Sequence, residues 1–199
     1  MSDSYHYIDP DFAYTDPTTE LLRNLQGITD PDVLVFVESA AVTKRLQELY
    51  DNPIRISGVD CLFKVHRLLF QDIYAWAGEK RTVEISKDGK QFFPVSHFNN
   101  ALRHIDQLIS EFSKIPEDER MHLARKLADI LDHINYLHPF REGNGRAQRE
   151  FLRLLALEKG LVLNLNPPDN KSVYERYMKG TIGSDLKTLT ELIFELIEN

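Results

Sequence analysis

The sequence has little cysteine and no sign of a membrane segment. Its one cysteine, Cys61, cannot form an internal disulfide, so a reducing compartment fits best, and its apolar neighbours predict a buried thiol. No stretch approaches the ~18 apolar residues of a membrane-spanning helix. Residues 1–20 are polar and acidic, unlike a signal peptide. We therefore expect a cytoplasmic protein, or one delivered into a host cytosol by a route that needs no N-terminal signal.

Positive charge is also in the minority. The chain has 24 Lys and Arg against 31 Asp and Glu, which gives a net charge of −7. General nucleic-acid binding needs a basic face, so this balance argues against direct nucleic-acid binding, although it leaves room for a small basic pocket. With 199 residues and a hydrophobic fraction of 42%, the chain is expected to bury a core without disulfides or structural metal.

Hydrophobic periodicity predicts an all-α helical bundle. Residues 1–16 are expected to form an extended arm, and residues 17–199 a single domain. Asp30 and Pro31 signal a helix start, and residues 57–60 resemble a capping box. The helices are expected at about 17–25, 30–50, 57–78 and 96–114, from 116 to the loop at 138–145, and at 144–160, 170–180 and 184–197.

One segment of the chain has β character. Two β-prone runs flank the turn that contains Asp88 and Gly89, and Asp-Gly between such runs is a strong hairpin signal. A two-stranded ribbon is marginally stable alone, so it must lean on the body or serve a purpose at the surface. The residues expected in its strands include Thr82, Val83, Glu84, Ile85, Gln91, Phe92 and Phe93.

The residues typical of phosphate chemistry are concentrated at 138–149. Gly143 and Gly145 let the backbone approach a ligand at the start of a helix, where several N–H groups converge on an anion. Arg146 and Arg149 share one helix face, where two guanidinium groups suit adjacent phosphates. Taken alone, the two glycines could form only a turn, and the two arginines could be only surface charges. Their conjunction within 12 residues favours a phosphate site.

The same loop offers a base and a metal ligand. A histidine ordinarily titrates near neutral pH, so His138 is expected to suit the removal of a proton from an attacking hydroxyl. Glu142 stands beside the phosphate cradle, where Mg²⁺ would remove the repulsion between a carboxylate and phosphates. Pro139 and Phe140 are expected to fix the loop, with Phe140 pointing into the core and holding His138.

Residues 138–149 resemble the signature of the Fic family, His-Pro-Phe-x-Asp/Glu-Gly-Asn-Gly-Arg-x-x-Arg, at every position. The similarity extends over roughly residues 15–195. It implies a Fic-type helical bundle with one hairpin flap. It also implies a protein adenylyltransferase that moves AMP from Mg-ATP to a Ser, Thr or Tyr hydroxyl of a target protein, releasing pyrophosphate.

The resemblance also implies roles for individual residues. His138 would be the base, Glu142 would bind Mg²⁺, and the backbone of 143–145 together with Asn144 would form the anion hole. Arg146 and Arg149 would hold the β- and γ-phosphates. The hairpin would align the target by strand addition, with Phe92 and Phe93 as clamps. Tyr174 and Tyr177 are candidates for an adenine pocket, with core packing an equal alternative.

Members of this family are commonly restrained by a helix with Ser/Thr-x-x-x-Glu-Gly/Asn, and this pattern is absent here. Only Glu142 and Glu198 precede Gly or Asn, and His138 and Phe194 stand four residues before them. The chain therefore resembles the toxin subclass inhibited by a separate small antitoxin, or one whose inhibitory segment was removed from a longer chain. The resemblance suggests type II topoisomerase subunits or small GTPases as targets.

Three alternatives remain open at this point. The same fold transfers UMP, phosphate or phosphocholine in other members. A metal-dependent hydrolase would use Asp129, Asp132, His133 and His138, although their spacing matches no established metal motif. A non-catalytic helical binding module would bind a partner through the bundle and ribbon alone.

Overall fold

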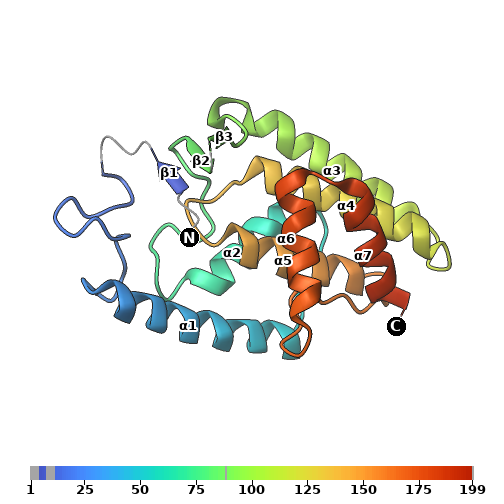
Figure 1. Cartoon of the computed structure of the whole chain (residues 1–199), viewed down its shortest axis with the longest axis horizontal. Coiled ribbons are helices and arrows are strands. Elements are labelled where there is room, and N and C mark those ends of the chain that lie inside the picture. The colour runs from blue at the N-terminus through green and yellow to red at the C-terminus, as the bar shows by residue number, and fades with distance from the viewer. Residues whose placement is uncertain (1–4, 8–11, 88, 199) are drawn as a thin grey trace.

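The computed structural model describes residues 5–7, 12–87 and 89–198, and it confirms a mostly helical bundle (Figure 1). Its described part contains seven α-helices, one 3-10 turn and three short strands. The α-helices are α1 (Pro31–Asp51), α2 (Asp60–Phe70), α3 (Phe98–Lys114), α4 (Arg120–Leu137), α5 (Asn144–Leu157), α6 (Lys171–Gly183) and α7 (Leu186–Glu198). The other elements are β1 (Tyr5–Tyr7), β2 (Ile85–Lys87), β3 (Lys90–Gln91) and the 3-10 turn η1 (Val95–His97).

The core is built around α4. This helix packs against α3, α5 and α7, while α2 packs on α5 and α1. In Figure 1, α1 and α3 lie on opposite edges, with α2 and α5 between them. The residues of α4 that are buried recur at helical spacing: Leu123, Ala124, Leu127, Ala128, Ile130, Leu131, Ile134 and Leu137. The two helices that flank the 138–143 loop, α4 and α5, therefore belong to the buried centre of the molecule.

Several helix limits agree with the expected ones. Asp30 caps α1, because its carboxylate accepts the N–H groups of Asp32 and Val33 at 3.0 Å each. Gly160 has a φ of +65° after α5. Cys61 is 2% exposed, as expected of a buried thiol. Within the residues described, no helix is long and apolar enough to cross a membrane.

The expected capping box at 57–60 is wrong. No side chain of α2 itself caps that helix, which follows Val59. Oδ1 of Asp106, on α3, accepts the N–H of Val59 at 2.7 Å instead. A tertiary contact thus replaces the local one. The helix also ends at Phe70, earlier than expected, and α3 and α4 start a few residues after Ser96 and Pro116.

The expected helix at 17–25 is also wrong. The carboxylate of Asp16 accepts the N–H groups of Thr18 and Thr19 in a tight turn. Glu20 has a φ of +59°, which reverses the chain. Thr15 and Leu22 then pair in an antiparallel bridge, so local side-chain hydrogen bonds win over helix propensity.

The expected N-terminal arm is described only in part. Residues 1–4 and 8–11 lie outside the described part of the chain, as do the side chains of Tyr5 and Tyr7. The backbone of 5–7 pairs antiparallel with 85–87. Tyr14 is buried, with its ring 5.6 Å from that of Trp76, so this aromatic of the expected arm docks on the body.

The hairpin is present but shifted and wider than expected. Its strands begin at Ile85, after residues 82–84, and β1 adds a third strand in the order β1-β2-β3, so the ribbon is not an isolated pair. Outside the strands, the guanidinium of Arg81 binds the carbonyl oxygens of Val83 and Phe93. Those oxygens are therefore engaged by a side chain at the base of the hairpin.

Candidate active site

His138 lies at the end of α4 in a left-handed conformation, with a φ of 45° and a ψ of 61°. Its Nδ1 lies 3.2 Å from the carbonyl oxygen of Asn135. Only a protonated Nδ1 donates to a carbonyl, so Nε2 carries the lone pair. The fold thus selects the tautomer in which Nε2 is able to accept a proton.

The imidazole of His138 is covered by the hairpin. The ring of Phe92 stacks on it, with centroids 3.8 Å apart and planes within 17°. Burial lowers the pKa of His138 to about 3, and the positive charges of Arg81 and Lys87 act in the same direction. The histidine is consequently neutral throughout the physiological range.

The loop that follows His138 is held by its own side chains. Asn144 accepts the N–H of Phe140 at 2.9 Å and donates to its carbonyl oxygen at 2.8 Å. The Asn144 side chain therefore staples the loop to Phe140, and its second Nδ2 hydrogen takes no part in these two bonds. Phe140 is fully buried as expected, but it stacks on His66 at 3.8 Å and not on His138.

His66 supports the loop from below. Its side chain is fully buried. Its Nδ1 accepts the N–H of Gly78 at 2.9 Å, so its Nε2 donates to the carbonyl oxygen of Glu142, also at 2.9 Å. Burial lowers the pKa of His66 to about 4. Its contact with the loop was missed because residues 66 and 142 are distant in sequence.

A glycine is required at the end of the loop. Gly143 has a φ of +78°, and a Cβ atom there would lie 2.3 Å from Cζ of Phe70. The first N–H accepted within α5 is that of Ala147, by the carbonyl oxygen of Gly143 at 3.0 Å. As at any helix start, the N–H groups before it lie outside the helical ladder. The start of α5 therefore has the geometry of an anion site.

Arg146 and Arg149, the two arginines of α5 in the predicted phosphate site, lie on aromatic rings. The guanidinium of Arg146 is 4.7 Å from the ring centre of Phe70, and its Nη1 is 2.5 Å from Oε1 of Glu38 on α1. The guanidinium of Arg149 is 5.4 Å from the ring centres of both Tyr174 and Tyr177. Glu38 was not identified from the sequence, since nothing local connects it with the loop.

One cavity of about 660 Å³ brings most of the expected residues together. Its lining includes His138, Glu142, Gly143, Gly145, Arg146, Arg149, Tyr174, Tyr177 and, from the hairpin, Phe92. The sequence interpretation missed Lys87, Lys90 and Gln91, which also line the cavity. Val83 and Ile85 are buried, while Thr82 and Glu84 are exposed. Residues 82–84 precede β2, and Ile85 is its first residue.

Glu142 is placed to act with the phosphate-binding groups. Its Oε1 accepts the N–H of Gly143 at 2.8 Å and lies 3.8 Å from Nη2 of Arg146. One carboxylate at the edge of an anion cradle fits the ligand set of Mg²⁺ with nucleotide phosphates.

The hydrolase hypothesis finds no support in the geometry. The part of the chain that the structure describes has no group of three or more metal-ligating side chains. His133 instead faces His104 on α3, with 3.2 Å between their Nε2 atoms, and its Nδ1 contacts the carbonyl oxygen of Asp129.

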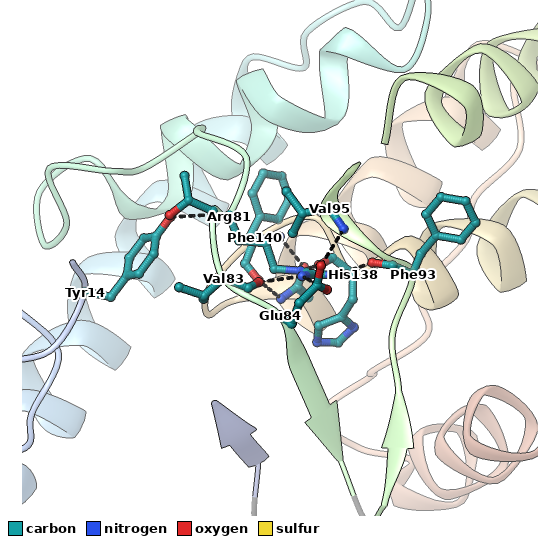
Figure 2. Close-up of polar contacts among 10 residues, drawn as sticks. Tyr14, Arg81, Val83, Glu84, Phe93, Val95, His138 and Phe140 are labelled. Carbon is teal, nitrogen blue, oxygen red and sulfur yellow. Dashed lines mark hydrogen bonds and ion pairs between the residues drawn. The ribbon is translucent and has the colours of Figure 1, made fainter. Parts of the chain in front are cut away.

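A buried arginine joins the loop to the hairpin. Arg81 is 1% exposed, and its Nε donates to the carbonyl oxygen of His138 at 2.8 Å. Figure 2 shows this side chain between His138 and the hairpin residues Val83, Glu84 and Phe93. Only the tertiary structure shows that Arg81 joins the loop to the hairpin, because an arginine is usually expected at the protein surface.

Comparison with known proteins identifies the family. The Fic/DOC family model matches residues 57–156. Protein adenylyltransferase VbhT of Bartonella schoenbuchensis is 38% identical over 150 residues, which is 74% of this chain and 31% of VbhT. The chain thus spans about a third of that relative. Probable protein adenylyltransferase y4lH of Sinorhizobium fredii is 30% identical over 194 residues, 96% of each protein.

The fold agrees with solved structures. BepC of Bartonella tribocorum, a VirB-translocated effector solved with bound AMPPNP, superposes with a TM-score of 0.80 at 20% sequence identity. The match covers 93% of this chain and 96% of that one, which establishes the Fic-type bundle with its hairpin. The chain therefore belongs to the Fic/DOC family.

Proposed function

We propose that the chain transfers AMP from Mg-ATP to a Ser, Thr or Tyr hydroxyl of another protein. The observation that supports this most is the convergence on one cavity of the neutral His138, the start of α5, and the guanidinium groups of Arg146 and Arg149. The arginines and the backbone at 143–145 would hold the phosphates, and Tyr174 and Tyr177 would border the adenine.

The proposed reaction uses Nε2 of His138 as the base. It accepts the proton of the target hydroxyl, whose oxygen bonds to the α-phosphorus. The bond from that phosphorus to the oxygen bridging the α- and β-phosphates breaks, and pyrophosphate leaves. Glu142 would hold Mg²⁺, which supplies charge neutralisation to the phosphates. Pro139 and Phe140 keep the loop in place, and Arg146 and Arg149 would stabilise the departing pyrophosphate.

The hairpin would receive the target. In the described sheet β3 lies at the edge, so its outer backbone groups suit the addition of a strand from another protein. Phe92 would clamp that segment near His138, and Phe93, anchored by its N–H on the carbonyl oxygen of Tyr136, would support it. The other flap residues, Thr82, Val83, Glu84 and Ile85, would carry the hairpin.

The biological setting is also a proposal. The chain would act as a toxin or effector, with residues 17–199 as one catalytic domain preceded by an arm. A separate small antitoxin with an inhibitory helix would restrain it, since the chain lacks the Ser/Thr-x-x-x-Glu-Gly/Asn pattern. Its target would be a type II topoisomerase subunit or a small GTPase.

The test determines which phosphate of ATP is transferred to a protein. The purified chain is incubated with Mg²⁺ and a bacterial lysate, with ATP labelled at the α-phosphate in one tube and at the γ-phosphate in another. We expect a protein band labelled from the α-phosphate only and lost in His138→Ala. With His133→Ala, on the exposed side of α4, the target band should be labelled as with the wild-type chain. A band labelled only from the γ-phosphate would establish phosphate transfer and overturn the proposal.

A further inference from the structure

We propose that Arg81 is a positioning residue that locks the base His138 to the hairpin, so that a target held by the hairpin meets the base in register. This inference rests on the proposed function. The inference adds to the proposed function a residue that lies 57 positions before His138 and outside the 138–149 segment.

The first half of the lock is at the catalytic loop. Nε of Arg81 donates to the carbonyl oxygen of His138 at 2.8 Å, and the backbone N–H of Arg81 donates to the carbonyl oxygen of Pro139, also at 2.8 Å. His138 has a positive φ, a conformation that costs free energy for a residue other than glycine. Such a conformation persists only where the surroundings impose it, and Arg81 is the side chain that holds the carbonyl group there.

The second half is at the hairpin. Nη1 and Nη2 of Arg81 donate to the carbonyl oxygens of Val83 and Phe93, at 2.6 Å each. Val83 precedes β2 and Phe93 follows β3, so one guanidinium joins both limbs of the hairpin at its base (Figure 2). The carboxylate of Glu84 lies 3.3 Å from Nη1 and also accepts the N–H of Val95.

Only an arginine meets these requirements. The Arg81 side chain is fully buried, with its guanidinium 4.9 Å from the ring centre of Phe98. A planar guanidinium presents donors in three in-plane directions, which matches three carbonyl groups arranged around it. The ammonium of a lysine is a single point and cannot span from the loop to both limbs of the hairpin.

The nucleotide half of the site has separate supports. His66 binds the carbonyl oxygen of Glu142, the Asn144 side chain staples Phe140, and Phe70 lies against Gly143. None of these contacts involves Arg81. Loss of the guanidinium should therefore disturb the relation of the hairpin to His138 while the phosphate cradle keeps its shape.

The experiment compares Arg81→Lys with the wild-type chain, with Arg55→Lys as a control at an exposed arginine. Three quantities are measured: the dissociation constant of AMPPNP, amide hydrogen exchange of residues 82–94, and the rate of band labelling from α-labelled ATP in the lysate. Far-ultraviolet circular dichroism verifies folding. If Arg81→Lys does not fold, the uncharged Arg81→Gln takes its place in all three measurements.

We expect labelling to slow by about tenfold to a hundredfold, the loss typical of a small misplacement of catalytic groups. Exchange of the hairpin amides should accelerate, while AMPPNP binds within about twofold of wild type. Unchanged labelling, or a parallel loss of AMPPNP affinity, would overturn the role of Arg81. If the wild-type chain labels no band from α-labelled ATP, the proposed function fails instead, and the exchange and binding measurements still decide whether Arg81 holds the hairpin.

Discussion

Glu38 and Arg146 are 108 residues apart, yet Oε1 of Glu38 lies 2.5 Å from Nη1 of Arg146. The second carboxylate oxygen accepts a hydrogen bond from the hydroxyl of Tyr74. Burial and the charge of Glu38 raise the pKa of Tyr74, so this hydroxyl remains a donor. The carboxylate is thus bound at both oxygens, and α1 becomes part of the support of the active site.

Removal of the Glu38 carboxylate should lower the stability of the folded chain. Glu38→Ala leaves a half-buried guanidinium and a buried hydroxyl without their acceptor, which should lower the free energy of unfolding by about 1–3 kcal/mol. Glu48→Ala, which removes exposed ion pairs from the same helix, should cost at most about 1 kcal/mol. Urea denaturation measures both values. Equal losses in the two variants would contradict the structural role of Glu38.

Gly143→Ala should be far more damaging than Gly160→Ala. Both glycines have a positive φ, but only at Gly143 would a Cβ atom meet a ring, that of Phe70 at 2.3 Å. Gly160→Ala should therefore show only the backbone cost, about 1 kcal/mol. Gly143→Ala should lose more stability and also bind AMPPNP weakly, because the start of α5 must shift. Thermal melts and calorimetric titration measure the two effects, and similar behaviour of the variants would refute the role of the close contact.

Acid should destabilise the chain through its buried histidines. The pKa values of His66 and His138 are about 4 and about 3 in the folded chain, against 6.5 for a free histidine. Below pH 6.5 the unfolded chain therefore binds more protons, and the free energy of unfolding falls as the pH decreases from 6.5 towards 4. The slope should be at most about 1.4 kcal/mol per pH unit for each histidine.

Replacement of one buried histidine should reduce this slope. His138→Ala removes one of the two groups, so the loss of stability between pH 6.5 and 4 becomes smaller than in the wild-type chain. His122→Gln, at an exposed histidine, is the comparison variant. Urea unfolding at four or five pH values between 4 and 7.5 gives the comparison. A slope that is the same in all three proteins would show that these histidines do not govern the acid response.

Arg149→Ala should weaken nucleotide binding by about ten- to a hundredfold, the effect of losing a charge-assisted hydrogen bond to phosphate. The matched control is Arg153→Ala, one turn further along α5, where the guanidinium pairs with Glu150 and does not line the 660 Å³ cavity. Calorimetric titration with AMPPNP measures both dissociation constants. A comparable loss in Arg153→Ala would mean that the charge of the helix, rather than the position of Arg149, attracts the nucleotide.

The sequence predicted the helices best where periodicity is strong and the caps are local. Asp30 caps α1 as expected, and α5 begins at Asn144 as expected. The sequence-based prediction failed where side-chain hydrogen bonds override helix propensity. Asp16 turns the chain where a helix was expected at 17–25, and Asp106 accepts the N–H of Val59 in place of the expected capping box before α2. Both failures have one physical reason, since a hydrogen bond to the backbone can come from any side chain that the fold brings near.

For the active site, the sequence by itself determined the chemistry. The residues of 138–149 are adjacent in the chain, so their identities alone predict a base, a carboxylate and a phosphate cradle. The tertiary structure decided how that chemistry is held, through Glu38 on Arg146, His66 on the carbonyl oxygen of Glu142, and Arg81 on that of His138. These contacts join residues 57 to 108 positions apart, and two of the three end on a backbone carbonyl, which has no sequence signature. Only the packing of the helices brings a distant side chain to it.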